Sequence, residues 1–293
     1  MHYVSFGLIV AIWGASFILM KKGTEQFAPA AVAAGRLLGG ACFLGAVLLW
    51  MWWRRPATVT SAPVKWRLVA FCSLLGYAWP YAIQPFLVNR HGSAFIGLSV
   101  SLVPLLTILV SIPLLGIYPT PQQVVGVLGA LVCIAGLMWD GLERSVPLRD
   151  LAFAFSVPLS YAIVNTLIRR SMRETPAALL SLLLLLFACL PILPLAAMTP
   201  GPVPAVGSSA ILSALAIAAL GVLGTGWSTL AFNQLIQSHG PLFAGMTTYL
   251  VPLGALLWGW LDRETVTPLQ IVCLCGVLAM VALTQLSSGR VVK

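Results

Sequence analysis

Polar side chains recur along one face of an apolar stretch in the first half of the chain. Tyr77, Tyr81 and Gln84 stand at i, i+4 and i+7, which places them on one side of a helix. Hydroxyl, amide and aromatic groups of this kind stack against a small ligand and orient it. The sequence shows no nucleophile triad, phosphate-binding glycine loop or metal-ligand cluster beside them. The stripe therefore predicts a binding site, and the protein is not expected to be an enzyme.

Arg36 is the only basic residue well inside an apolar run. Counted from Ala28, it lies about 12 Å deep at a rise of about 1.5 Å per residue, in a hydrocarbon core about 30 Å thick. A guanidinium at this depth can bind a substrate carboxylate through two hydrogen bonds. It can equally be structural, bonding backbone carbonyls between helices or extending toward the membrane surface. Both roles stay open, and a single arginine suits a zwitterionic or singly charged substrate.

Acidic residues are absent from the middle of every apolar run. The seven lie at or near predicted loops: Glu25, Asp140, Glu143, Asp150, Glu174, Asp262 and Glu264. Proton-coupled transport usually needs an ionisable group within the membrane, so the sequence favours facilitated, uncoupled movement. A proton-coupled multidrug or metabolite antiporter is the alternative, with His91 and His239 as its candidate titrating groups. The position of each histidine beside a loop glycine favours anchoring at the membrane surface instead.

The composition requires a membrane protein. Of 293 residues, 60% are hydrophobic and 8% charged, against about 45–50% and about 25% in soluble domains. Apolar runs bounded by Pro, Gly and charged residues predict ten spans, at 3–20, 28–52, 66–88, 93–115, 121–139, 148–168, 176–197, 208–236, 241–261 and 267–286. We therefore expect an all-α membrane protein, and we read the net charge of +9 as a loop surplus of Lys and Arg rather than as a nucleic-acid surface.

An even number of spans places both termini on the same side, and the Lys and Arg distribution indicates which side. With the termini inside, the inner segments hold nine: Arg54, Arg55, Lys65, Arg67, Arg169, Arg170, Arg173, Arg290 and Lys293. The outer segments hold six: Lys21, Lys22, Arg90, Arg144, Arg149 and Arg263. The bias predicts a multi-pass protein of the inner or plasma membrane with both termini in the cytoplasm.

The two halves of the chain repeat each other. A shift of 148 residues matches 89–104 to 237–252 with seven identities in sixteen positions, among them the His-Gly pairs at 91–92 and 239–240. Because each repeat has five spans, the second must enter the membrane from the opposite side. We predict two inverted five-helix domains, 1–147 and 148–293. Inverted repeats are typical of alternating-access transporters, which bind substrate near the midplane between the halves.

The repeat extends the polar stripe into a predicted cavity. The same shift relates Trp13 and Phe17 to Tyr161 and Asn165. It places the stripe of the second half at Thr225, Thr229 and Phe232. The predicted substrate-binding set is Trp13, Phe17, Arg36, Tyr77, Tyr81, Gln84, Ser99, Tyr161, Asn165, Thr225, Trp227, Asn233, Thr247 and Tyr249. Pro104 and Pro252 occupy matched positions and are candidate hinges, although a purely packing role is equally open.

No cofactor or metal is expected. The six cysteines lie in apolar stretches without a CxxC pair or a nearby histidine, which argues against disulfides and zinc. The expected partners are a small-molecule substrate, an amino acid or similar metabolite, and the lipid bilayer. Neither nucleic acid nor an obligate protein partner is expected.

The chain resembles a known family over its whole length. The resemblance rests on several motifs. Near the N-terminus it rests on Ile12-Trp13-Gly14-Ala15-Ser16-Phe17, Lys21-Lys22 and Arg36. Further along it rests on the proline-containing spans around Pro104 and Pro252 and on the Thr-Pro-x-Gln-x5-Gly segments that begin at 120 and 267. These features are similar to the ten-helix EamA-type exporters of the drug/metabolite transporter superfamily. The Tyr- and Trp-rich third span is most similar to the YddG-type aromatic amino acid exporters. The resemblance implies export of amino acids, aromatic ones in particular. The family's usual Glu before Thr-Pro is present as Glu264 but replaced by Gly116 in the first half.

Overall fold

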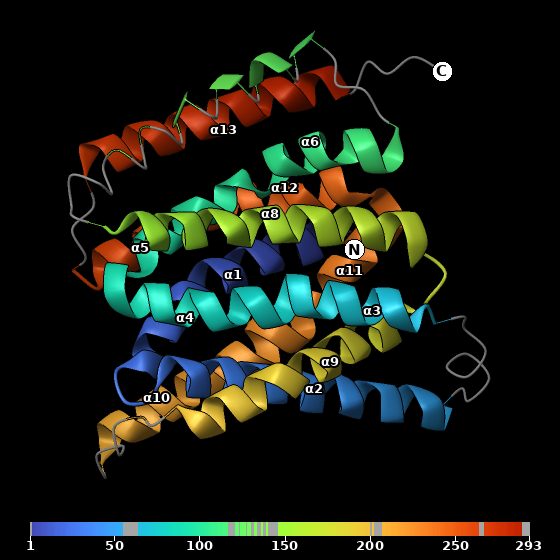
Figure 1. Ribbon diagram of the computed structural model, residues 1–293, viewed down its shortest axis with the longest axis vertical. Helices are drawn as coiled ribbons and strands as arrows, with labels where there is room; N and C mark the ends of the chain where they lie inside the picture. The colour runs from blue at the N-terminus through green and yellow to red at the C-terminus, as the bar shows by residue number, and fades with distance from the viewer. Residues whose placement is uncertain are drawn as a thin grey trace.

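A computed structural model of the chain describes residues 2–54, 64–116, 146–199, 201, 207–263 and 267–288, with short pieces of 121–139. Its helices run side by side with both repeats interleaved (Figure 1). The first repeat contains α1 (His2–Thr24), α2 (Pro29–Arg54), a long helix built of α3 (Trp66–Ser73), η2 (Leu74–Ala78) and α4 (Trp79–His91), and a second composite of α5 (Ser93–Ser99), η3 (Val100–Leu102) and α6 (Val103–Leu115).

The second repeat follows the same order. It contains α8 (Leu148–Ser171), α9 (Ala177–Met198), a long helix built of α10 (Ser208–Ala219), η4 (Leu220–Trp227) and α11 (Ser228–His239), then α12 (Pro241–Leu261) and α13 (Pro268–Ser288). Five segments of the described chain are long and apolar enough to cross a membrane on their own: 5–24, 29–54, 148–171, 177–198 and 208–239. Of the fifth predicted span, 121–139, the structure describes only separate short pieces.

Equivalent residues end equivalent helices. Gly92 ends α4 with φ 86°, and Gly240 ends α11 with φ 92°. Glycine adopts positive φ without steric cost, so it stops the helix and lets the chain reverse. Pro241 then begins α12, where its missing N–H loses no helical bond. The repeated His-Gly pair therefore marks the same turn in both halves.

The described helices are four of the first repeat and five of the second, and the fold class is that of a ten-helix membrane protein with two inverted five-helix repeats. Helix α2 packs against α9 and η4, and α1 packs against α12, so each main interface joins the two repeats. The closest approach is at glycines: a Cβ on Gly14 would lie 3.0 Å from Gly254 Cα, and one on Gly39 would lie 3.1 Å from Gly221 Cα. Small residues of this kind let helix backbones pack tightly where lipid removes most of the hydrophobic driving force.

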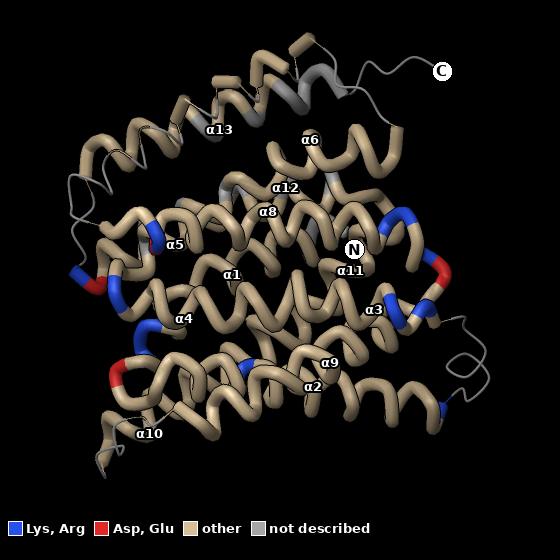
Figure 2. The backbone as a smooth tube through the Cα atoms, in the orientation of Figure 1, with Lys and Arg blue, Asp and Glu red and all other residues tan. Residues whose placement is uncertain are grey.

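Most charged residues lie near the two ends of the bundle (Figure 2). At one end two acidic residues join the repeats. Asp262, after α12, lies 2.5 Å from Lys21 Nζ and 3.0 Å from Lys22 Nζ of α1. Asp150, in the first turn of α8, is fully buried and lies 2.9 Å from His91 Nε2 at the end of α4. His91, which the sequence placed at the membrane surface, thus makes a hydrogen bond to Asp150 of the other repeat.

The backbone structure differs between the two candidate hinges, Pro104 and Pro252. The helix containing Pro104 is interrupted by the 3₁₀ turn η3 directly before it, whereas α12 continues as an α-helix through residue 252. A 3₁₀ turn inside a long helix is a local break in the hydrogen-bond ladder. Pro104 is buried, and the side chain of Pro252 lies outside the described residues. The hinge role of both stays a prediction.

Candidate functional site

A cavity lies between the repeats, near the middle of the helices that line it. Eighteen residues form its wall, seven of them from the second repeat. Each of these seven pairs with a wall residue 148 positions earlier: Trp13/Tyr161, Ser16/Val164, Phe17/Asn165, Tyr81/Thr229, Gln84/Phe232, Val100/Thr248 and Val103/Val251. The cavity therefore follows the symmetry of the inverted repeat. Met20, Arg36, Gly76 and Tyr77 complete the wall from the first repeat alone.

A π-helical turn interrupts the third helix of each repeat beside this cavity. Turn η2 covers Leu74–Ala78 and turn η4 covers Leu220–Trp227. The equivalent glycines Gly76 and Gly224 lie within them. A π turn inserts one extra residue, so the side chains after it move to a different face. In η4 the hydroxyl of Thr225 donates a hydrogen bond to Leu220 O five residues earlier, at 3.1 Å.

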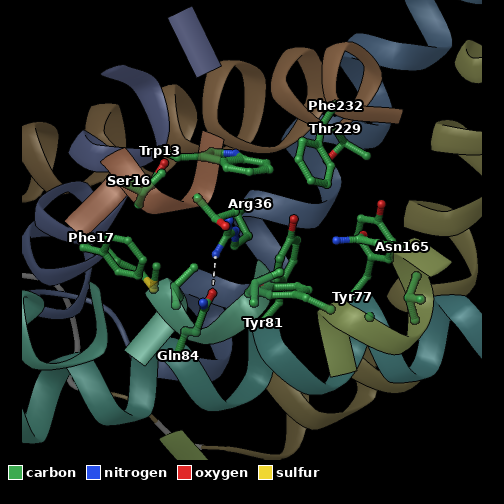
Figure 3. Close-up of a pocket in the computed structure, with 18 residues that line it drawn as sticks. Trp13, Ser16, Phe17, Arg36, Tyr77, Tyr81, Gln84, Asn165, Thr229 and Phe232 are labelled. Carbon is green, nitrogen blue, oxygen red and sulfur yellow. Dashed lines mark hydrogen bonds between the residues drawn. The ribbon is translucent and has the colours of Figure 1, made fainter. Parts of the chain in front are cut away.

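Arg36 extends from α2 into the cavity and is 4% exposed (Figure 3). Its Nε donates a hydrogen bond to Thr225 Oγ1 at 3.1 Å, and Nη1 donates to Gln84 Oε1 at 3.5 Å. The guanidinium carbon lies 3.7 Å from the centre of the Tyr81 ring, a cation–π contact. All three partners are neutral. The described part of the cavity wall contains no carboxylate, so the positive charge has no counter-ion there.

Aromatic rings surround the charge. Trp13 and Phe232 have ring centres 4.8 Å apart, and Tyr77 and Tyr81 have ring centres 5.8 Å apart in an edge-to-face arrangement. Trp13 Nε1 donates to the carbonyl of Gly224 at 3.2 Å, which fixes the indole across the repeat interface. Such rings offer flat apolar surfaces for stacking.

The cavity is small in this arrangement, with a volume of about 80 Å³. That is room for several water molecules, since one water needs about 10–15 Å³ on this measure. Pockets for drug-sized ligands span about 300–1,000 Å³. A ligand with an aromatic ring therefore requires the lining side chains or helices to move apart.

Eight of the fourteen predicted binding residues are in the wall: Trp13, Phe17, Arg36, Tyr77, Tyr81, Gln84, Tyr161 and Asn165. Five more lie away from it. Thr225 bonds Arg36, Asn233 donates to Ser181 Oγ at 2.9 Å, and Trp227 packs on the neighbouring apolar core. Ser99 and Thr247 donate to backbone carbonyls of their own helices. The side chain of Tyr249 lies outside the described residues.

Sequence reasoning missed ten wall residues: Ser16, Met20, Gly76, Val100, Val103, Val164, Thr229, Phe232, Thr248 and Val251. Most are small or apolar and give no chemical signal of their own. Thr229 and Phe232 were visible as the repeat partners of Tyr81 and Gln84. The predicted set took Thr225 and Asn233 from the same alignment, and both lie outside the wall.

Comparison with known proteins supports this architecture. A crystal structure of another protein superposes with a TM-score of 0.72, covering 99% of this chain and 99% of its own, at 18% sequence identity. That likeness concerns the fold alone. No curated protein matches the sequence. The model of the EamA-like transporter family matches twice, over residues 2–139 and 149–286. Each match covers one repeat, and the chain belongs to the EamA-like transporter family.

Proposed function

We propose that the protein exports amino acids, aromatic ones above all, and other small metabolites by alternating access without coupling to an ion gradient. Its family already makes it a membrane transporter of small molecules. The observation that carries the finer proposal is Arg36, a buried cation without a counter-ion in the described cavity, set among aromatic rings. We further propose the domain boundaries 1–147 and 148–293.

The unpaired guanidinium supports a carboxylate ligand. A buried charge is costly unless it is paired, and the neutral partners of Arg36 leave that cost uncompensated. A substrate carboxylate supplies the missing charge and accepts two parallel hydrogen bonds from one guanidinium. One cation fits one carboxylate, so nucleotide sugars and sugar phosphates are disfavoured.

The rings support an aromatic side chain. Tyr81 already lies over Arg36, and Trp13 and Phe232 face the same cavity. An amino acid held by its carboxylate at Arg36 would place its side chain among these rings. Aromatic pairs contribute about 0.5–1.5 kcal/mol beyond the burial of their area, which favours phenylalanine, tyrosine and tryptophan over aliphatic amino acids.

The positions of the Asp and Glu residues support transport without coupling to an ion gradient. The described acidic residues, Glu25, Asp150, Glu174 and Asp262, lie at helix ends or in loops and not in the cavity wall. The rival, a proton-coupled antiporter, would have to use a group at a helix end, such as the His91–Asp150 pair. We place both termini in the cytoplasm of an inner or plasma membrane, with this pair on the outer side.

Counterflow in proteoliposomes tests the proposal. Purified protein is reconstituted, the lumen is loaded with unlabelled phenylalanine, and uptake of labelled phenylalanine or tryptophan is followed without an ion gradient. Uptake above that of empty liposomes is expected. If flux requires an imposed pH gradient, the transport is proton-coupled and the uncoupled mechanism is wrong. If there is no flux with or without the gradient, the aromatic amino acid assignment is wrong.

A further inference from the structure

We propose that Asn165 makes the transporter selective, among aromatic amino acids, for those whose ring carries a hydrogen-bond donor. Tyrosine and tryptophan are then preferred over phenylalanine. This inference rests on the proposed function and deepens it, because it assigns a second polar contact to the same substrate. Arg36 holds the carboxylate, and Asn165 binds the polar atom on the ring.

Asn165 is a buried amide of the cavity wall without a partner among the described residues. The described wall contains two side-chain amides, Gln84 and Asn165. Gln84 Oε1 accepts a hydrogen bond from Arg36 Nη1 at 3.5 Å. Asn165 is 6% exposed, and its side chain makes no hydrogen bond to any described residue. Since an amide buried without hydrogen bonds is costly, a molecule in the cavity has to supply them.

Several other polar groups of the wall are already bonded within the protein. The hydroxyls of Ser16 and Thr248 donate to backbone carbonyls of their own helices, at 2.8 and 2.7 Å. The Trp13 indole donates to the carbonyl of Gly224 at 3.2 Å. Asn165 keeps two N–H donors and a carbonyl oxygen with two lone pairs. That oxygen can accept a hydrogen bond from a phenol O–H or from an indole N–H.

Asn165 lies across the cavity from Arg36. Arg36 belongs to α2 and Asn165 to α8, and the helix that carries Tyr77 and Tyr81 packs against both. The two side chains enter the cavity from opposite sides, with the tyrosine pair between them (Figure 3). An amino acid with its carboxylate at Arg36 and its ring beside these tyrosines directs the far edge of that ring toward Asn165. Tyrosine carries its hydroxyl at this edge.

The selectivity follows from the water that a substrate displaces. The cavity of about 80 Å³ has room for several water molecules, and water can satisfy the Asn165 amide when no substrate is bound. An entering ring takes the place of this water. The O–H of tyrosine restores the hydrogen bond, whereas the C–H edge of phenylalanine does not. Displacing an ordered water without reproducing its hydrogen bonds lowers affinity.

Competition against labelled phenylalanine bound to the purified protein measures the preference. The competitors are tyrosine, 4-aminophenylalanine, which keeps an N–H donor at the same ring position, and 4-fluorophenylalanine, which has no donor there. Tyrosine and 4-aminophenylalanine should bind about twofold to tenfold tighter than phenylalanine, the range for one neutral hydrogen bond. The fluorinated compound should bind about as phenylalanine does.

Two variants assign the preference to the amide. Asn165→Leu keeps the size of the side chain and removes the amide, so the preference for tyrosine should disappear. Thr229→Val removes a hydroxyl from the same wall and leaves the amide in place. In this variant the affinities for both amino acids can change together, but their ratio should stay that of the unmodified protein.

Three outcomes overturn the inference while leaving the proposed function standing. One is equal affinity for tyrosine and phenylalanine in the unmodified protein. Another is a preference that persists in Asn165→Leu or disappears only in Thr229→Val. The third is 4-fluorophenylalanine binding as tightly as tyrosine. If labelled phenylalanine does not bind at all, the proposed function itself fails. If Asn165→Leu does not fold, the ligand series with the unmodified protein decides.

Discussion

Arg36 of the first repeat and Thr225 of the second share a hydrogen bond of 3.1 Å, although 189 residues separate them in the chain. The bond joins the only cation of the cavity wall, among the described residues, to a π-helical turn of the opposite repeat. Under the proposal that Arg36 binds the substrate carboxylate, substrate recognition and the relative position of the repeats meet at one side chain. A ligand that takes the guanidinium also competes with a contact that holds the two halves together.

Tyr81 should contribute to affinity through its ring rather than its hydroxyl. The ring lies 3.7 Å from the Arg36 guanidinium, and a cation–π contact is worth about 0.5–2 kcal/mol. Tyr81→Leu should raise the KM for phenylalanine about twofold to thirtyfold, and Tyr81→Phe should leave it near the original value. The measurement is uptake in proteoliposomes, normalised to the amount of protein reconstituted. Equal loss in both variants would point to the hydroxyl instead.

Substitution of Asn165 should affect substrate binding, whereas substitution of Asn233 should affect the stability of the fold. Asn165 lines the cavity, whereas Asn233 is buried behind its wall and donates to Ser181 Oγ at 2.9 Å. Asn233→Ala leaves a buried hydroxyl without its partner, which costs about 1–3 kcal/mol, so the thermal unfolding midpoint in detergent should fall. Asn165→Ala should change KM with little change in that midpoint. The reverse assignment of effects would mean that the cavity wall is wrongly placed.

Gly14 should tolerate no side chain, in contrast to Gly7 of the same helix. A Cβ on Gly14 would lie 3.0 Å from Gly254 Cα, a backbone atom that cannot turn aside, while nothing lies within 4 Å of a Cβ on Gly7. Overpacking of this kind costs about 1–3 kcal/mol. Gly14→Ala should lower the unfolding midpoint and transport together, and Gly7→Ala should lower neither. A neutral Gly14→Ala would show that α1 and α12 are farther apart than described.

The ion pair at Asp262 predicts how the stability of the fold changes at acidic pH. Burial raises the pKa of this carboxyl, but hydrogen bonds from Lys21 and Lys22 outweigh that effect and hold the pKa below its ordinary 3.8. A lowered pKa means that the contact stabilises the fold above about pH 3.8 and loses its effect as the pH falls through the folded pKa. The difference in unfolding midpoint between the original protein and Asp262→Asn should therefore be constant from pH 7 to about 5. It should shrink on further acidification, and a difference that grew in acid would exclude this ion pair.

Much of the fold could be predicted because hydropathy and repetition act over whole helices. The expected spans at 28–52 and 148–168 correspond to α2, Pro29–Arg54, and α8, Leu148–Ser171. The repeated His-Gly pairs likewise mark helix ends, where positive φ requires glycine. Each of these signals is local in sequence, so a single chain suffices to find it.

The site was harder to predict because its wall depends on contacts between segments that are distant in the sequence. Arg36 and the Tyr77–Tyr81 stripe stand out because polar groups are rare in apolar helices. On the second half the repeat points to Thr229 and Phe232, which line the cavity, and to Thr225, which bonds Arg36 beside it. Val100 and Val251 could not have been selected, since a valine at a cavity wall looks like one facing lipid.

The most direct test of the central account is equilibrium binding of labelled phenylalanine to the purified protein, with competition by 3-phenylpropionate and by phenethylamine. If the Arg36 guanidinium binds the substrate carboxylate, 3-phenylpropionate should compete and phenethylamine should not. Replacing Arg36 by Gln should weaken phenylalanine binding at least about tenfold, because hydrogen bonds to charged groups are worth about 1.5–3 kcal/mol. Competition by phenethylamine as strong as that by 3-phenylpropionate, or unchanged phenylalanine binding in Arg36→Gln, would contradict it.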